Sequence, residues 1–126
     1  MPARHKPLLL AALLLGMTAF CAPASYEWMM AVPEKARVHE NPLASSPQAA
    51  PAGAKLFEQH CAQCHGRDAT GRAGKPNLRS HRVRQATPGE LEWLLTNGSL
   101  RNGMPSWSRL PEAQRWQIVT YLKSLQ

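Results

Sequence analysis

The sequence predicts a small all-α domain preceded by an export signal and a linker. Three segments carry apolar residues at helical spacing, and loops rich in glycine and proline separate them. No segment alternates polar and apolar residues as a half-buried strand would. With 126 residues, the chain is long enough for one such domain of three to four helices and its extensions.

Residues 1–24 have the features of an export signal. Basic residues at Arg4 and Lys6 precede an apolar run over residues 8–20, and Ala-Pro-Ala at 22–24 has the pattern of a cleavage site. The apolar run is short for a helix that crosses a bilayer, which disfavours a retained membrane anchor. We therefore expect an exported, periplasmic protein.

Cys21 leaves two details of export open. Cleavage after Cys21 is an alternative to cleavage after Ala24, because the residues at 19 and 21 are both small. Cys21 could instead carry a lipid anchor, but Phe20 before it is large for that processing, so this reading is less favoured. The mature protein is accordingly either soluble or membrane-associated.

Residues 25–50 are predicted to form an arm or linker rich in proline and alanine. Prolines interrupt any helical periodicity, and the stretch 44–50 is of low complexity. An apolar cluster at residues 26–32 is too large to stay in water, so it either packs on the domain or docks on a partner. The domain itself is assigned to residues 51–126.

The first predicted helix of the domain runs over residues 52–61, with Pro51 acceptable in its first turn. A loop with several glycines and prolines follows over residues 66–76. Thr87-Pro88-Gly89-Glu90 is a capping box with proline at the first helical position, and it opens a helix that ends at Asn97-Gly98.

The last predicted helix covers residues 111–125. Its apolar positions, at residues 118, 121, 122 and 125, follow the i, i+3, i+4, i+7 spacing of one helical face. A domain of this size has a thin hydrophobic core by itself. A large buried cofactor would complete the core, and without it we expect the chain to be largely unfolded.

Residues 61–65 read Cys-Ala-Gln-Cys-His, the attachment pattern of a c-type haem. Cys61 and Cys64 lie on one helical turn, where each thiol can add to a haem vinyl group, and His65 is then placed to ligate the iron. A thioredoxin-like pair would need a βαβ pattern, which is absent. A structural zinc site would need four ligands, and no second cysteine pair exists. Haem attachment is therefore the favoured reading.

Met104 is the candidate for the sixth iron ligand. It is the only methionine after the haem motif, and it lies in an Asn-Gly-Met-Pro loop where packing in a helical stripe does not explain it. His81 is the rival, since bis-histidine ligation would give a lower potential. His81 lies among arginines, however, and is expected on the surface, as are His60 and His39.

From residue 52 to residue 125 the chain resembles the class I c-type cytochromes, here a mono-haem, His/Met-ligated, bacterial exported type. The resemblance implies a small three-to-four-helix cytochrome c fold wrapped around one covalent haem c with its iron. The arm of residues 25–50 lies outside the pattern. The matching residues are Gly53, Phe57, Cys61, Cys64, His65, Gly66, Pro76, Asn77, Leu78, Asn97, Gly98, Gly103, Met104, Pro105, Ile118, Tyr121 and Leu122.

The resemblance also implies particular contacts. Gly53 and Phe57 of the first helix would pack against Ile118 and Tyr121 of the last. The carbonyl of Pro76 would orient His65 through its second ring nitrogen. Met104 would take the place of the family's methionine ligand.

Trp107, just after the methionine loop, either packs on the haem, bonds a haem propionate, or belongs to the core. These readings stay open. The candidate cofactor-binding residues are Cys61, Cys64, His65, Pro76, Met104 and Trp107, with His65 and Met104 as the metal ligands and no catalytic residue.

The net charge is +7, of which Arg4 and Lys6 belong to the expected export signal, and much of the remaining positive charge lies near the haem motif. Between residues 67 and 84, six basic side chains are opposed only by Asp68. The run is either a solvated loop or a positive face that steers a redox partner with an acidic docking surface or meets anionic lipid. Nucleic acid is disfavoured because no aromatic residues interleave with the basic ones. No oligomeric state is indicated.

Two strong ligands leave no site for substrate, so the leading functional hypothesis is a one-electron carrier rather than an enzyme. One alternative is a haem c subunit of a larger oxidoreductase, docked at a membrane complex. Another is a ligand-binding or sensing haem protein whose Met104 is displaceable. No distal histidine and arginine pair can be assigned to peroxide chemistry from the sequence.

Overall fold

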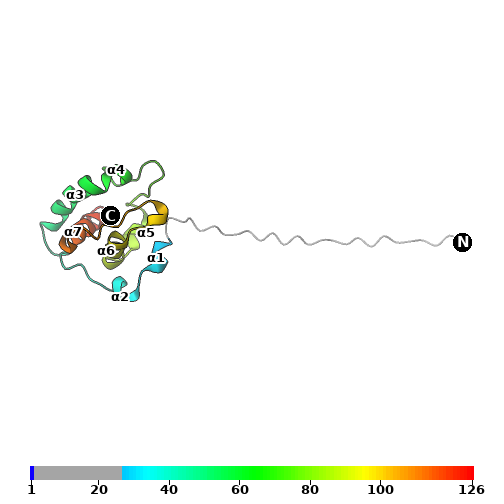
Figure 1. Ribbon diagram of the computed structural model, residues 1–126, viewed down its shortest axis with the longest axis horizontal. Helices are drawn as coiled ribbons and strands as arrows, with labels where there is room; N and C mark the ends of the chain where they lie inside the picture. Colours follow the sequence, from blue (N-terminus) through cyan, green and yellow to red (C-terminus); the bar gives the residue numbers. More distant parts are fainter. Residues whose placement is uncertain (2–26) are drawn as a thin grey trace.

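The computed structural model describes Met1 and residues 27–126, and the expected export signal therefore lies outside the described residues apart from Met1. Within that part, the chain is all-α, with a single isolated β-bridge between Ser99 and Met104 (Figure 1). The helices are α1 Trp28–Ala31, α2 Glu34–Arg37, α3 Ala49–His60, α4 Ala62–His65, α5 His81–Gln85, α6 Pro88–Asn97, the 3₁₀ helix η2 Leu100–Asn102, and α7 Glu112–Ser124.

Helices α3 and α7 cross at the centre of the domain and bring its two ends together. At the crossing, Gly53 lets the backbones approach so closely that a Cβ on it would lie 1.9 Å from the carbonyl oxygen of Gln117. One turn further along α3, the rings of Phe57 and Tyr121 pack with centroids 5.4 Å apart. The contact between the first and last helices is therefore present, and Ile118 beside it is fully buried.

Replacing Gly53 with alanine is expected to destabilise the domain by about 1–3 kcal/mol or more, because two backbones would have to separate to admit the methyl group. Urea unfolding of the holoprotein measures this effect. Gly74→Ala is the matched control, since that glycine has open space around it and a positive φ, which alone costs an alanine about 1–2 kcal/mol. Equal free energies of unfolding for the two variants would contradict the close backbone approach of α3 and α7 at Gly53.

Helix α6 begins and ends where the sequence predicts. The Thr87 hydroxyl oxygen accepts from the Glu90 amide at 3.1 Å, and the Thr87 amide donates to the Glu90 carboxylate at 2.8 Å, which completes the capping box. The helix ends before Gly98, whose φ is +71°. Helices α3 and α7 each agree with their predicted bounds to within a few residues.

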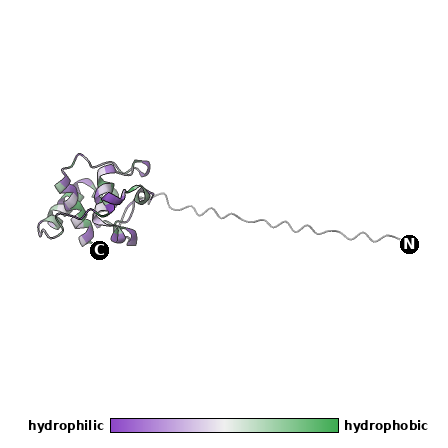
Figure 2. Cartoon of the chain, turned by 90° about the horizontal axis from the view of Figure 1, so that it is seen from below, coloured by the Kyte–Doolittle hydropathy of each residue, from purple (hydrophilic) through white to green (hydrophobic). Residues whose placement is uncertain are grey.

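Residues 27–50 contain two short helices and pack against the domain. Val32 is only 4% exposed, and helix α2 lies on α6. At the same interface a Cβ on Gly89 would lie 1.9 Å from the carbonyl oxygen of Ala36. Hydrophilic residues cover the outer turns, while the buried core lies between α3, α6 and α7 (Figure 2). Helix α5, inside the basic run, is a further element that periodicity does not reveal.

Candidate functional site

A cavity opens between the α3–α4 end of the domain and the loop that follows α6. Its walls are mainly apolar side chains from α3, α5, α6 and α7. All six predicted cofactor-binding residues line this one cavity, together with residues that the motifs do not indicate. The apolar walls include Trp28, Phe57, Leu78, Val83, Leu91, Leu94, Leu95, Ile118 and Leu122.

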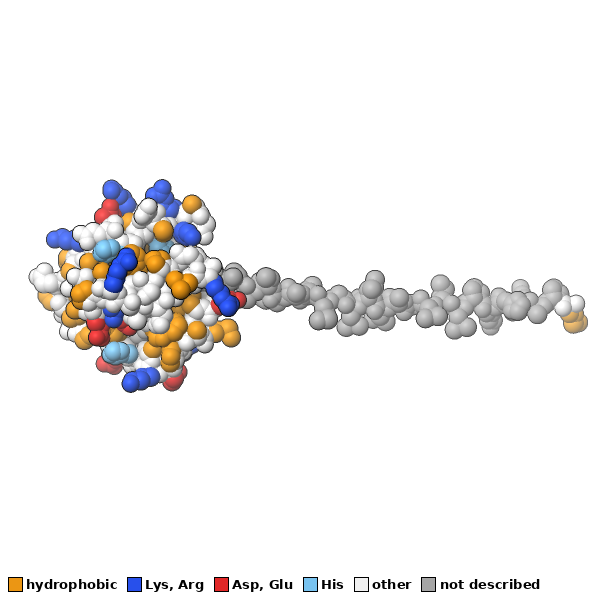
Figure 3. Space-filling model, viewed as in Figure 1, with side chains coloured by type: hydrophobic (Ala, Val, Ile, Leu, Met, Phe, Trp, Pro, Cys, Tyr) orange, Lys and Arg blue, Asp and Glu red, His pale blue; other side chains and the backbone are white. Residues whose placement is uncertain are grey.

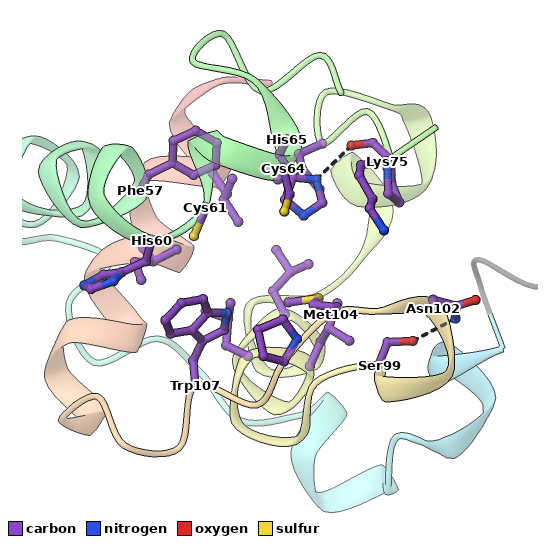
Figure 4. A pocket seen from close by; sticks show the side chains of 18 of the residues that line it. Phe57, His60, Cys61, Cys64, His65, Lys75, Ser99, Asn102, Met104 and Trp107 are labelled. Carbon is purple, nitrogen blue, oxygen red and sulfur yellow. Dashed lines mark hydrogen bonds between the residues drawn. The ribbon is translucent and has the colours of Figure 1, made fainter. Parts of the chain in front are cut away.

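The two cysteines enter the cavity from the junction of two helices. Cys61 ends α3 and precedes α4, and the amide of His65 donates to its carbonyl at 3.0 Å. This single turn places Cys64 and His65 next to each other. Figure 4 shows both sulfur atoms and the His65 ring directed into the cavity.

Burial raises the pKa of the Cys61 thiol to about 12, and the neighbouring Cys64 thiol acts in the same direction. The Cys61 sulfur therefore stays protonated in this environment at neutral pH. A thioether at the same position has no proton to lose. Burial therefore disfavours a thiolate at this position but not a thioether. Neither Cys61 nor Cys64 is in a disulfide.

The His65 ring is oriented by Pro76. Its Nδ1 lies 3.0 Å from the Pro76 carbonyl oxygen, so the Nδ1–H donates to the carbonyl and the Nε2 lone pair faces the cavity (Figure 4). The intervening loop is held by the amide of Gly71, which donates to the His65 carbonyl at 2.7 Å. Gly71 has a φ of +90°, and a Cβ there would lie 2.5 Å from the Lys75 carbonyl oxygen.

Met104 faces Cys64 and His65 from the opposite wall of the cavity (Figure 4). Its backbone is fixed by two hydrogen bonds with Ser99, at 2.9 Å and 3.1 Å. The loop turns back tightly at Gly98, where a Cβ would lie 2.7 Å from the backbone of Pro105. A thioether sulfur from the methionine loop and an imidazole nitrogen from the end of α4 are thus presented to the same space.

Trp107 forms one end of the cavity. Its amide donates to the Leu95 carbonyl at 2.7 Å, and its ring packs on that of His60 with centroids 5.1 Å apart. The Arg109 guanidinium lies 5.0 Å from the centroid of the Trp107 ring. His60, expected on the surface, is half-buried and lines the cavity, because it occupies the last turn of α3 just before Cys61.

Two further histidines of the described residues, His81 and His39, lie away from the cavity lining. His81 begins α5, is exposed, and does not line the cavity. His39 packs its ring edge-on against Trp116 at 5.1 Å. Of the two sixth-ligand candidates, Met104 is the one that lines the cavity with His65.

Lys75 and Trp28 are residues of this site that sequence reasoning missed. Lys75 is the single Lys or Arg among the side chains that line the cavity, within the part of the chain that is described, and Asp and Glu are absent from that lining. Its ammonium group reaches the methionine loop, where a Cβ on Gly103 would lie 3.3 Å away. Lys75 belongs to the basic run near the haem motif and Trp28 to the apolar cluster of residues 26–32, but no motif indicated that either side chain lines the cavity.

Comparisons with known proteins agree with this arrangement. Residues 48–122 match the family described as cytochrome c oxidase, cbb3-type, subunit III. The Cbb3-type cytochrome c oxidase subunit CcoP of Rubrivivax gelatinosus is 41% identical over 64 residues, which is 50% of this chain. This chain spans 21% of the length of that relative.

A solved structure shows the same fold. Cytochrome CL from the marine methylotrophic bacterium Methylophaga aminisulfidivorans MPT superposes with a TM-score of 0.59 at 23% identity. The match covers 88% of this chain and 71% of that protein. It supports the all-α cytochrome fold.

The residues present fit a covalent haem c with its iron. Two cysteine sulfurs, an oriented imidazole and a thioether face one cavity whose remaining walls are mainly apolar, as a flat apolar macrocycle requires. Among residues 27–126 and Met1, no group of three or more His, Cys, Asp or Glu side chains is placed to hold a bare metal ion. The chain is a c-type cytochrome and belongs to the family of cbb3-type cytochrome c oxidase subunit III.

Proposed function

We propose that this chain is a mono-haem one-electron carrier in which His65 and Met104 ligate the iron. The observation that carries the proposal is the position of these two side chains on opposite walls of one apolar cavity, directly beside Cys61 and Cys64. If both side chains ligate the iron, no coordination position would be left there for a substrate. The protein would then be a carrier rather than an enzyme.

The haem, when bound, supplies the reversible ferric–ferrous couple. The chain's own residues set its properties. Cys61 and Cys64 hold the group covalently, and the Pro76 carbonyl keeps the His65 ring in one tautomer and orientation. The Met104 sulfur is a soft ligand that favours the reduced state. The apolar walls exclude water, which disfavours the additional positive charge of the ferric state.

The position of Lys75 indicates where the propionate carboxylates of a haem would lie. A haem c carries two propionate groups, and Lys75 is the cation on the cavity wall, on the side of the Ser99 and Asn102 turn (Figure 4). The amide of Asn102 donates to the Ser99 hydroxyl at 2.8 Å in that turn. Trp107 lies at the end of the cavity beside His60, a position that favours packing on the macrocycle over a propionate bond.

Redox partners would approach the face around α4 and the loop after it. Figure 3 shows Lys and Arg side chains gathered over this part of the surface. Arg67, Arg72 and Lys75 are exposed there, although Arg67 also pairs with Glu58 at 2.9 Å. A positive rim beside the cavity favours a partner with an acidic docking surface.

An alternative is that the chain is the haem c component of a larger oxidoreductase, and the match to the CcoP subunit favours it. In both cases the chain would hold a haem that supplies single-electron transfer, and the difference is whether the redox partners are fixed. Export to the periplasm is proposed from residues 1–24. Among residues 27–126, no helix combines the length and apolar composition needed to cross a membrane.

A redox titration of the purified holoprotein tests the proposal. We expect the absorbance to follow a one-electron Nernst curve, with the protein reversibly reduced and reoxidised without loss of its low-spin spectrum. Haem c subunits in a fixed complex would show the same curve, so co-purification of the untagged partner from the native membrane separates the two cases. A haem that oxidises irreversibly or turns over peroxide would contradict a carrier function.

A further inference from the structure

Helix α1 closes part of the haem cavity although it lies outside the matched residues 48–122. Trp28 lines the cavity and is half-buried, and Met29 packs against the core. In Figures 1 and 4, α1 lies beside the turn that carries Ser99 and Asn102, on the Met104 side of the cavity. The segment that looked like a linker thus contributes a wall to the site.

A partly buried ion pair holds α1 in this position. Glu90 is 5% exposed, and its carboxylate accepts from the Arg37 guanidinium. A second nitrogen of the same guanidinium donates to the carbonyl of Met29. Arg37 therefore links the first turn of α6 to the backbone of α1, directly beside Trp28. A planar guanidinium can make both bonds at once, which a lysine ammonium does less well.

Further contacts fasten the same segment to the domain. The Thr87 hydroxyl donates to the Arg37 carbonyl at 2.8 Å, so one threonine both caps α6 and binds α2. The side-chain amide of Asn41 donates to the hydroxyl of Thr120, a residue of α7, at 2.8 Å. The position of α1 is thus set by contacts at α2 and beyond, and not by α1 alone.

We propose that residues 27–41 form a strap that closes the Met104 side of the haem cavity, with Trp28 as its positioning residue and Arg37 as its tie. This inference rests on the proposed His65 and Met104 ligation. The Trp28 ring keeps water from that wall and supports the methionine loop. Without it, Met104 is displaced more readily by an external ligand, and the ferric state is better solvated.

Three single variants of the holoprotein test the strap. Trp28→Ala is expected to lower the midpoint potential and to tighten cyanide binding to the ferric protein by about tenfold, equivalent to about 1.4 kcal/mol of easier Met104 displacement. Trp28→Phe should restore most of both properties. Met30→Ala is the matched control on the same helix, because Met30 is 88% exposed, and it should behave as the unaltered protein.

Arg37→Lys distinguishes the link to α1 from a general loss of stability of the fold. This variant keeps a positive charge beside Glu90 but loses the fork that also reaches Met29. We expect it to shift potential and cyanide affinity in the same direction as Trp28→Ala. Combined with Trp28→Ala it should add little, because both changes release the same wall.

Two results would overturn the strap. One is equality of Trp28→Ala with Met30→Ala in potential and cyanide affinity, and the other is full additivity of Arg37→Lys with Trp28→Ala. Failure of the proposed function itself would look different, because the unaltered protein would then lack a closed low-spin spectrum before any variant is made. If the unaltered protein has a closed low-spin spectrum but the variants leave potential and cyanide affinity unchanged, only the strap proposal is wrong.

Discussion

Replacing both Cys61 and Cys64 with alanine is expected to abolish covalent haem attachment and to leave the chain largely unfolded. The apolar side chains that line the cavity, such as Leu91 and Ile118, would lose the cofactor against which they pack. Burial of each such side chain is worth about 1.5–3 kcal/mol. Several of them together approach the about 5–15 kcal/mol that stabilises a whole domain.

The measurement uses cells that attach haem to exported proteins. Far-UV circular dichroism reports helix content, and haem staining on a denaturing gel reports covalent attachment. Gln63→Ala is the matched control, because Gln63 lies between the two cysteines on the same turn and is exposed. A helical, protease-resistant double variant would contradict the account of the cofactor as part of the core.

Replacing Met104 with leucine is expected to open the sixth coordination position. Leucine has nearly the same volume and apolar character, so the loop held by Ser99 should keep its conformation, but no sulfur remains to bind iron. The ferric spectrum should change from low-spin toward high-spin, the midpoint potential should fall, and the ferrous protein should bind carbon monoxide. Absorbance spectroscopy and a redox titration measure all three.

Two further variants make the Met104 result decisive. Met30→Leu changes an exposed methionine and should leave the spectrum unchanged. His81→Ala tests the rival ligand, which lies on α5 outside the cavity lining, and should also have no effect. A low-spin Met104→Leu protein that becomes high-spin only with His81→Ala would assign the sixth position to His81.

The central features of the site were predictable because they are local in the sequence. The spacing of Cys61, Cys64 and His65 places all three on one turn, and this needs no knowledge of the rest of the fold. The capping box at Thr87 and Glu90 is likewise a pattern of four adjacent residues, and the structure confirms it. Local hydrogen bonding and helical geometry therefore determined these predictions.

The features that escaped prediction depend on contacts between distant residues. Arg37 and Glu90 are 53 positions apart, and nothing in the arm's proline-rich composition indicates that it packs on α6. Glu90 was interpreted as a cap, and its second role as the buried partner of Arg37 requires the tertiary structure. Helix α5 is short and mostly polar, so periodicity could not reveal it.

The positions of Lys75 and His60 illustrate the same limit. Both belong to segments whose ends were predicted, the loop before Pro76 and the helix before Cys61. Whether a side chain at such an end faces solvent or the cavity depends on how the chain turns next. The left-handed backbone at Gly71 turns the loop so that Lys75 lines the cavity.

The absorbance spectrum of the ferrous holoprotein before and after addition of carbon monoxide tests the central claim most directly. The claim is that His65 and Met104 both hold the iron. It predicts a low-spin ferrous spectrum that carbon monoxide leaves unchanged, while the Met104→Leu variant shifts at once. A prompt shift of the unaltered protein would show an open or readily displaced sixth position, and would favour a ligand-binding haem protein over an electron carrier.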